Sequence, residues 1–108
     1  MAKDDYAIAS EWADRIEAAM RGAGMWQTEP LPEEAYQFTQ AFAMDTMAYS
    51  QWLQFIFLDR IRSIIAERGN FPPKSQVAAQ AVREFDGFHE ASELCSVLSE
   101  FDAWINRR

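Results

Sequence analysis

Residues 42–58, which read FAMDTMAYSQWLQFIFL, are the most densely apolar segment of the chain. Written as a helix, the first half of this segment is apolar nearly all the way round, and the second half has one polar face. Such a helix is not stable alone in water, because its apolar surface must be buried against other elements. The segment therefore predicts a helical protein in which the rest of the chain covers this helix.

The central helix is expected to begin at Asp45 or Thr46, whose short side-chain oxygen could cap it, and to run to about residue 67. At α-helical spacing its main apolar stripe is Leu53, Phe57, Ile61 and Ile64. Trp52 and Phe55 fall on the far side, next to polar residues. The first half of the helix therefore needs cover on two faces, whereas the second half is an ordinary amphipathic helix.

Three further segments have helical periodicity and end at glycine or other break signals. These helices are expected from about Asp4 or Asp5 to residue 21, from Pro72 and Pro73 through about residue 85, and over about residues 90–105. No stretch alternates apolar and polar residues for long, so no sheet is expected. The predicted fold class is all-α: a four-helix bundle or array in one domain of residues 1–108, with a long, packed connection between helices 1 and 2.

That connection, residues 25–44, is too apolar to be a solvated linker. A short helical turn is expected over residues 32–37, with proline at its start. Because long connections without structure of their own are uncommon, the segment is expected to pack down and to shelter Trp26. It would also cover Trp52 and Phe55. If it does not, these side chains form an exposed aromatic patch, which is typical of protein interfaces.

The overall charge of the chain limits its partners. The net charge is −7 at pH 7, there are only two lysines, and the eight arginines are scattered except for the pair Arg107-Arg108. Because a surface that follows phosphates needs clustered Lys and Arg, no direct binding of nucleic acid is expected. No apolar run approaches the roughly 20 residues of a membrane helix, and the single cysteine fits a reducing compartment. These features predict a cytoplasmic protein that does not enter a membrane.

The sequence contains little catalytic or metal-binding chemistry. Asp86 and His89 have the i, i+3 spacing of di-iron bundles, but such sites need two of these motifs, and Gly87 would break the helix between the pair. Cys95 has glutamates nearby that would raise its pKa, so a small buried apolar role is expected for it. We therefore expect no catalytic residue, no cofactor and no metal.

Two motifs, Phe42-x-Met-Asp-Thr-Met47 and Trp52-Leu-Gln-Phe-Ile-Phe-Leu-x-Arg60, are the most distinctive in the chain. Together with Trp26-x-x-Glu-Pro30 and Phe71-Pro-Pro, they resemble the bacterial YqcC family over most of the chain. The resemblance implies a helical fold and an association, by gene neighbourhood, with tRNA pseudouridine synthase C. It implies no catalytic residues. The chain does not resemble that synthase itself, which is a larger α/β protein with a catalytic aspartate beside a sheet.

Two functions are open from the sequence. The first is a non-catalytic protein-interaction or accessory factor, connected with tRNA modification, that binds another protein or a second copy of itself. The second is a small-molecule-binding protein or an enzyme with a pocket between the helices near residues 25–55. Asp45 is either a helix cap or a contact to a partner. The candidate partner-binding residues are Trp26, Phe42, Met44, Asp45, Thr46, Trp52 and Phe55.

Overall fold

The computed structural model of the chain describes residues 4–108, so the first three residues of the expected domain lie outside the described part. All regular elements in residues 4–108 are helical, which confirms the predicted all-α class. Three separate helices are α1 (Asp5–Gly22), α4 (Val77–Glu84) and α5 (Ser92–Arg107). The central helix is continuous through α2 (Tyr49–Trp52), the π-helical η3 (Leu53–Phe57) and α3 (Leu58–Glu67).

Helix α1 follows the sequence prediction within one residue. Asp4 is its N-cap and accepts a hydrogen bond from the Ala7 N–H at 2.8 Å, and Asp5 places a negative charge in the first turn. The residues that α1 buries recur at helical spacing, so one face of the helix enters the core. They are Ala9, Ala13, Ile16, Ala19 and Met20.

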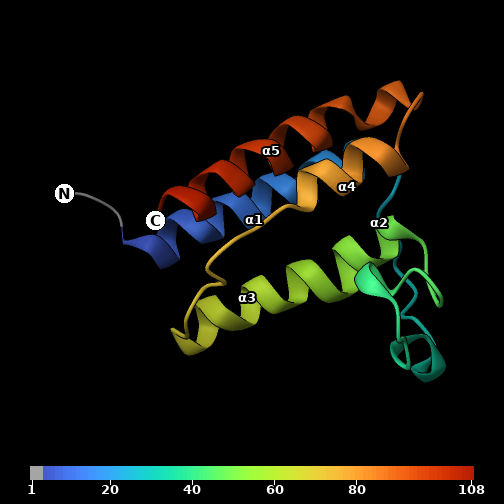
Figure 1. Cartoon of the computed structure of the whole chain (residues 1–108), viewed down its shortest axis with the longest axis horizontal. Helices are drawn as coiled ribbons and strands as arrows, with labels where there is room; N and C mark the ends of the chain where they lie inside the picture. The colour runs from blue at the N-terminus through green and yellow to red at the C-terminus, as the bar shows by residue number, and fades with distance from the viewer. Residues whose placement is uncertain (1–3) are drawn as a thin grey trace.

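The helices form two layers that α1 joins. Helix α5 packs along both α1 and α4, and α1 also packs against α3. Figure 1 shows α1, α4 and α5 together and the central helix on the other side of α1, with residues 68–76 crossing from the end of α3 to the start of α4. Helices α3 and α4 do not pack extensively on each other. This arrangement leaves room between α3 and the segment that leads into α4.

The start of the central helix corrects one prediction. The helix begins at Tyr49, and its N-cap residue is Ala48, whose N–H donates to the Gln51 side chain at 2.9 Å. Asp45 and Thr46 do not cap it, because they lie in a turn before the helix and bond to the preceding connection. The predicted end near residue 67 is confirmed, and Arg68 closes the helix in the left-handed conformation.

The π-helical segment corrects a second prediction, the side of the helix on which Trp52 lies. In η3 the i→i+5 bonds place more residues in each turn, so side chains before it are rotated relative to those after it. Uniform α spacing put Trp52 beside Phe55 and away from the core. In the structure Trp52 is only 8% exposed, whereas Phe55 is half-buried. The wider turn therefore brings Trp52 to the inner face.

The third helix begins later than predicted. Pro72 and Pro73 lie in the irregular segment before it, and α4 starts at Val77. The reason lies on α5: the Asp102 carboxylate accepts hydrogen bonds from the Val77 and Ala78 N–H groups at 3.2 and 2.8 Å. A side chain from another helix thus supplies the cap, and it determines where α4 can begin. The last helix agrees with its prediction, with a short turn, η4 (His89–Ala91), before α5.

The connection between α1 and the central helix is packed, as predicted. It contains the expected short turn, η1 (Glu33–Tyr36), directly after a proline, and a second one, η2 (Ala41–Ala43). Phe42 and Ala43 both have left-handed backbone angles, with φ of 57° and 54°. Non-glycine residues rarely adopt this conformation, so other contacts must hold the backbone there.

Candidate functional site

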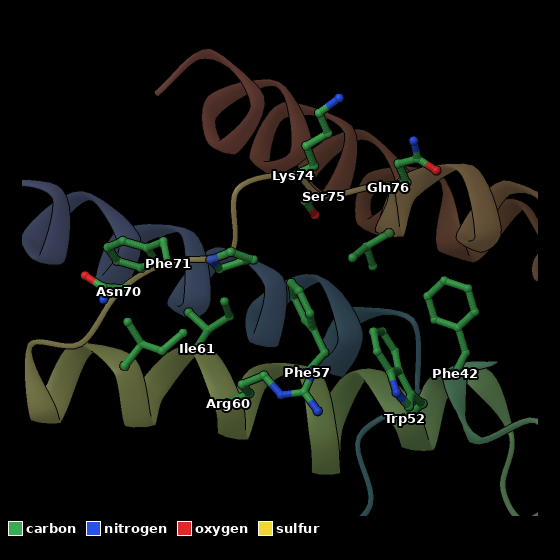
Figure 2. Close-up of a pocket in the computed structure, with 13 residues that line it drawn as sticks. Phe42, Trp52, Phe57, Arg60, Ile61, Asn70, Phe71, Lys74, Ser75 and Gln76 are labelled. Atoms are coloured by element: carbon green, nitrogen blue, oxygen red, sulfur yellow. The ribbon is translucent and has the colours of Figure 1, made fainter. Parts of the chain in front are cut away.

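A groove lies between the central helix and residues 70–77, with a volume of about 380 Å³. Figure 2 shows Trp52, Phe57 and Ile61 rising from the helix toward the opposite segment, with Phe42 near one end of the groove and Phe71 toward the other. The remaining lining residues are Arg60, Ile64, Asn70, Pro72, Lys74, Ser75, Gln76 and Val77. The groove thus has an apolar floor and polar groups along its edges.

One end of the groove is an aromatic cluster. The Phe42 ring meets Trp52 edge-on at a centroid distance of 4.9 Å and Tyr49 edge-on at 5.4 Å. Trp52 also stacks on Phe57 at 5.7 Å. Edge-to-face pairs of this kind stabilise by about 1 kcal/mol beyond the area they bury. The Phe42 side chain, on a left-handed backbone, is thus packed against two aromatic rings at this end of the groove.

The wall opposite the central helix is held by two polar side chains of α5. Asn106 accepts from the Ser75 N–H at 2.9 Å and donates to the Ser75 carbonyl at 3.0 Å. Asp102 accepts from the Ser75 hydroxyl as well as from the first turn of α4. Asp102 is 9% exposed, so its hydrogen bonds are shielded from water. We call this arrangement the Ser75 clamp; it fastens the segment that forms this wall to α5.

Tyr49 links the central helix to the opposite wall. Its hydroxyl donates to the Val77 carbonyl at 2.8 Å in a buried position. Burial raises the pKa of Tyr49 well above its ordinary value, and the nearby Asp102 carboxylate raises it further. Tyr49 is therefore a neutral hydrogen-bond donor at physiological pH, with its proton committed to a structural bond.

Four other polar side chains on the edges of the groove form no such hydrogen bonds. Within residues 4–108, the side chains of Arg60, Asn70, Lys74 and Gln76 form no hydrogen bond or ion pair. No Asp or Glu is among the described residues that line the groove. In a chain with a net charge of −7, this groove is a local region of positive charge with free donors.

A second depression, of about 490 Å³, lies elsewhere on the central helix, and we call it the Trp26 depression. Two of its polar side chains, Arg62 and Gln54, are already paired. The Arg62 guanidinium contacts Glu17 at 3.0 Å and Asp14 at 3.4 Å, and Arg21 lies over the Trp26 ring at 4.8 Å. The Trp26 depression is lined by Trp26, Tyr36, Gln54, Phe55, Asp59 and Arg62.

The side-chain amide of Gln54 in the Trp26 depression is also hydrogen-bonded, through both its oxygen and its nitrogen. Its amide oxygen accepts from the Gln27 N–H at 3.0 Å, and its amide nitrogen donates to the Gln27 carbonyl at 2.7 Å. These bonds fasten the connection to the central helix. Trp26, which belongs to this connection, is half-buried and packs against the core, so the predicted shelter for Trp26 is partial.

The residues predicted as one partner-binding surface lie in several places. Phe42 and Trp52 line the groove, whereas Trp26 and Phe55 line the Trp26 depression. Met44 is 46% exposed, and its sulfur accepts from the Gln80 side chain at 3.7 Å. The structure therefore divides four of the seven candidates between two hollows and leaves Met44, Asp45 and Thr46 outside both.

Asp45 and Thr46 hold the connection in shape. The Asp45 carboxylate accepts from the Thr39 N–H and hydroxyl, both at 3.0 Å, and the Thr46 hydroxyl donates to the Ala35 carbonyl at 2.6 Å. The Thr39 N–H bond is the main cause that lowers the pKa of Asp45 below its ordinary value of 3.8. Asp45 is thus an ionised anchor for the turn that precedes the helix.

Sequence reasoning missed the polar edge of the groove and the clamp behind it. In the sequence, Arg60 stands out only as the end of a motif, and Lys74 is predicted to lie in the third helix. No local signal reveals that Asp102 contacts Ser75, because the contact joins residues on separate elements. An aspartate among the inward-facing residues of the last helix was the one available sign of a buried polar contact.

Other reactive groups lie outside both hollows. His89 is exposed at the start of η4, and Cys95 is half-buried. Burial raises the pKa of the Cys95 thiol, so the cause is desolvation and not the neighbouring glutamates. Within residues 4–108, no three His, Cys, Asp or Glu side chains gather closely enough to hold a metal ion. None of the helices in that range is both long and apolar enough to cross a membrane.

Comparison with known proteins places the chain in a family. Residues 9–104 match the model of the DUF446 family, described as tRNA pseudouridine synthase C. The chain belongs to this family. The matched range includes every residue that lines the groove, together with Asp102 of the clamp.

Two relatives illustrate the range of the DUF446 match. An uncharacterised protein of Haemophilus influenzae is 25% identical over 93 residues, which cover 86% of this chain and 88% of that protein. A Pectobacterium carotovorum subsp. carotovorum protein named tRNA pseudouridine synthase C is 42% identical over 50 residues, which cover 46% of this chain and 13% of that protein. No solved structure matches the chain significantly.

Proposed function

We propose that this chain is a single helical domain that acts as a non-catalytic interaction module, an accessory factor to tRNA pseudouridine synthase C. The observation that carries the proposal is the groove: an apolar floor bordered by four polar side chains, those of Arg60, Asn70, Lys74 and Gln76, that have no partner within residues 4–108. Protein-binding surfaces commonly combine an apolar centre with a polar rim of this kind. The partner would satisfy the rim and cover the floor.

The link to tRNA modification rests on the family and on one relative. The family description names tRNA pseudouridine synthase C, and so does the Pectobacterium relative. The segment similar to this chain is 13% of that relative, so most of its length is available for other work. An accessory role explains why a small helical segment is found in a protein that carries the name of a larger enzyme. The resemblance to the YqcC family supports the same association.

The charges of the chain favour a protein partner over RNA. The net charge is −7, and five described arginines are neutralised by ion pairs, so little positive surface is available for phosphates. The paired arginines are Arg15, Arg21, Arg62, Arg68 and Arg108. In this proposal the synthase contacts the tRNA, and the accessory factor works in the cytoplasm beside it.

Co-purification from the native host tests the proposal. An affinity-tagged chain, expressed at its natural level, is isolated and its partners are identified by mass spectrometry. An unrelated acidic helical protein with the same tag is the control. We expect enrichment of the synthase over the control and co-elution of the two purified proteins in size-exclusion chromatography. Failure of the synthase to appear in both experiments would overturn the proposal.

A small-molecule site is the second candidate function, and the volume of the groove favours it. About 380 Å³ lies within the usual range for ligand pockets. The groove takes Phe42 and Trp52 from the predicted region of residues 25–55, although most of its lining comes from later residues. A metabolite panel in a thermal-shift assay tests this function. A ligand that raises the melting temperature at a concentration near its cellular level would favour it over a protein partner.

A further inference from the structure

We infer that the groove binds a short amphipathic helix of a partner protein, with acidic residues on the polar side of that helix. This inference rests on the proposed interaction function and specifies the chemistry of the partner at the same site. Three observations carry it: the length of the groove, the half-buried apolar side chains within it, and the unpaired positive charges on its edges.

The length of the groove suits a helix of a few turns. The lining residues on the central helix extend from Trp52 to Ile64, which corresponds to about 18 Å at a rise of about 1.5 Å per residue. A docked helix of about three turns spans this distance. Helices that bind in grooves present apolar anchors at positions i, i+3 or i+4, and i+7, which repeat over the same length.

The floor of the groove has apolar surface that such anchors would cover. Phe57 and Ile61 are buried, whereas Ile64, Phe71 and Pro72 are half-buried. Phe71 packs against Tyr6, at a centroid distance of 5.4 Å, and against Trp104 of α5, and the Arg108 guanidinium lies over its ring. The apolar surface is therefore preformed, and binding requires little reordering of the chain.

The charges on the edges select an acidic partner. Among the described lysines and arginines, four have no ion-pair partner: Arg60, Lys74, Arg83 and Arg107. Two of these four, Arg60 and Lys74, line the groove, and no acidic residue lies between them among its described lining residues. Complementary charge steers association and selects partners, so carboxylates on the docked helix would face these cations.

The placement of the two cations favours a helix over a single small carboxylate. Arg60 lies on the central helix, and Lys74 lies on the segment that forms the opposite wall, as Figure 2 shows. Lys74 extends outward, and its flexible four-carbon stem can follow a ligand above the edge. A helix can place acidic residues along both of its flanks, one toward each wall. A ligand with one carboxylate would engage one wall at a time.

Synthetic peptides test the inference directly. A fluorescent amphipathic peptide of about 14 residues carries a leucine stripe and glutamates elsewhere. Its lysine analogue and a scrambled glutamate peptide without the stripe are the peptide controls. Fluorescence anisotropy measures the affinity of each for the full chain. We expect both controls to bind at least about tenfold more weakly than the acidic amphipathic peptide.

Charge reversal in the chain supplies the matched comparison. The double variant Arg60→Glu/Lys74→Glu should lose at least about tenfold in affinity for the acidic peptide and gain affinity for the lysine peptide. The control Arg83→Glu/Arg107→Glu makes the same change in net charge at exposed residues outside the groove, and should change either affinity less than about twofold. Circular dichroism melts establish that both double variants are folded.

Equal binding of the acidic peptide by the two double variants would overturn the inference. Binding of dodecanoate in place of the peptide would also overturn it, because the ligand would then be a small carboxylate. A dimer of the unmodified chain that the groove variant, but not its control, fails to form would overturn it as well. The tagged variants are also used in the host. If the groove variant still co-purifies with the synthase, the inference is overturned and the proposed function is not. If the synthase does not co-purify with the unmodified chain, the proposed function is overturned and the inference is not. Loss with the groove variant but not its control supports both.

Discussion

The groove and the Trp26 depression lie on the same helix, and both combine aromatic floors with an arginine. They differ in what the polar groups do. Arg62 in the Trp26 depression contacts Glu17 at 3.0 Å, and Gln54 bonds twice to the connection. Arg60, two residues before Arg62 on the same helix, has no partner within residues 4–108. Composition alone therefore does not distinguish a site that holds the fold together from a site that is free to bind.

The largest expected effect tests the difference in packing between the two hollows. Trp52→Ala should lower the free energy of unfolding by about 4 kcal/mol, because it removes a buried indole from the aromatic end of the groove. Phe55→Ala should cost about 1.5 kcal/mol, since Phe55 is half-buried. Urea denaturation of both variants measures these values. Equal losses would contradict the assignment of Trp52 to the core and Phe55 to the surface.

The second test concerns the Ser75 clamp. Asp102→Ala leaves the Ser75 hydroxyl and the Val77 and Ala78 N–H groups without their acceptor, and should cost about 3 kcal/mol. Asp59→Ala, at an exposed residue of the Trp26 depression, is the matched control and should cost less than about 0.5 kcal/mol. Both are measured by urea denaturation. A loss for Asp102→Ala as small as that of the control would mean that the clamp does not hold the groove.

The third test compares the two arginines. Arg62→Ala breaks contacts to Glu17 and Asp14 and should cost about 0.5 kcal/mol, and this loss should shrink as salt screens the pairs. Arg60→Ala should change stability by less than about 0.3 kcal/mol, since Arg60 has no such contact. Thermal melts at low and high salt measure both. A salt-dependent loss for Arg60→Ala would mean that Arg60 is already paired in the folded chain.

The smallest expected effect concerns Asp45, which anchors the turn next to Phe42. Its pKa is lower in the folded chain than its ordinary value of 3.8, so the ionised form stabilises the fold. This contribution is present above the ordinary value and is lost as the pH falls through the lower folded pKa. Asp45→Asn should therefore be slightly less stable than the unmodified chain at neutral pH, and the difference should vanish in acid. A difference independent of pH would exclude this role for the carboxylate.

The sequence predicted what local periodicity determines. The four-helix class, the bounds of α1, the packed connection and its turn at Glu33–Tyr36 all follow from apolar spacing and proline placement. The candidate site was predicted only in part, because Phe42 and Trp52 line the groove whereas the other five candidates do not. Helical spacing identifies an apolar face, but it does not identify the residues that another element places opposite that face.

The errors have specific physical causes. The π-helical turn at Leu53–Phe57 rotates Trp52 inward, and no residue in it signals a departure from α spacing. Asp45 was expected to cap the helix after it, but it bonds backward to Thr39. Lys74 was assigned to a helix because two prolines precede it, whereas Asp102 sets the start of α4 at Val77. Each error is a place where a distant contact outweighed a local preference.

The Ser75 clamp also has a consequence for the order in which the chain assembles. The first turn of α4 obtains its acceptor from α5, and Ser75 obtains both of its backbone partners from Asn106. Residues 70–77 therefore have little reason to adopt their final path until α5 has docked. The groove should be among the last features to form, so a partner that recognises it would meet only completely folded molecules. Binding would then distinguish completely folded molecules of this chain from molecules in which α5 has not yet docked.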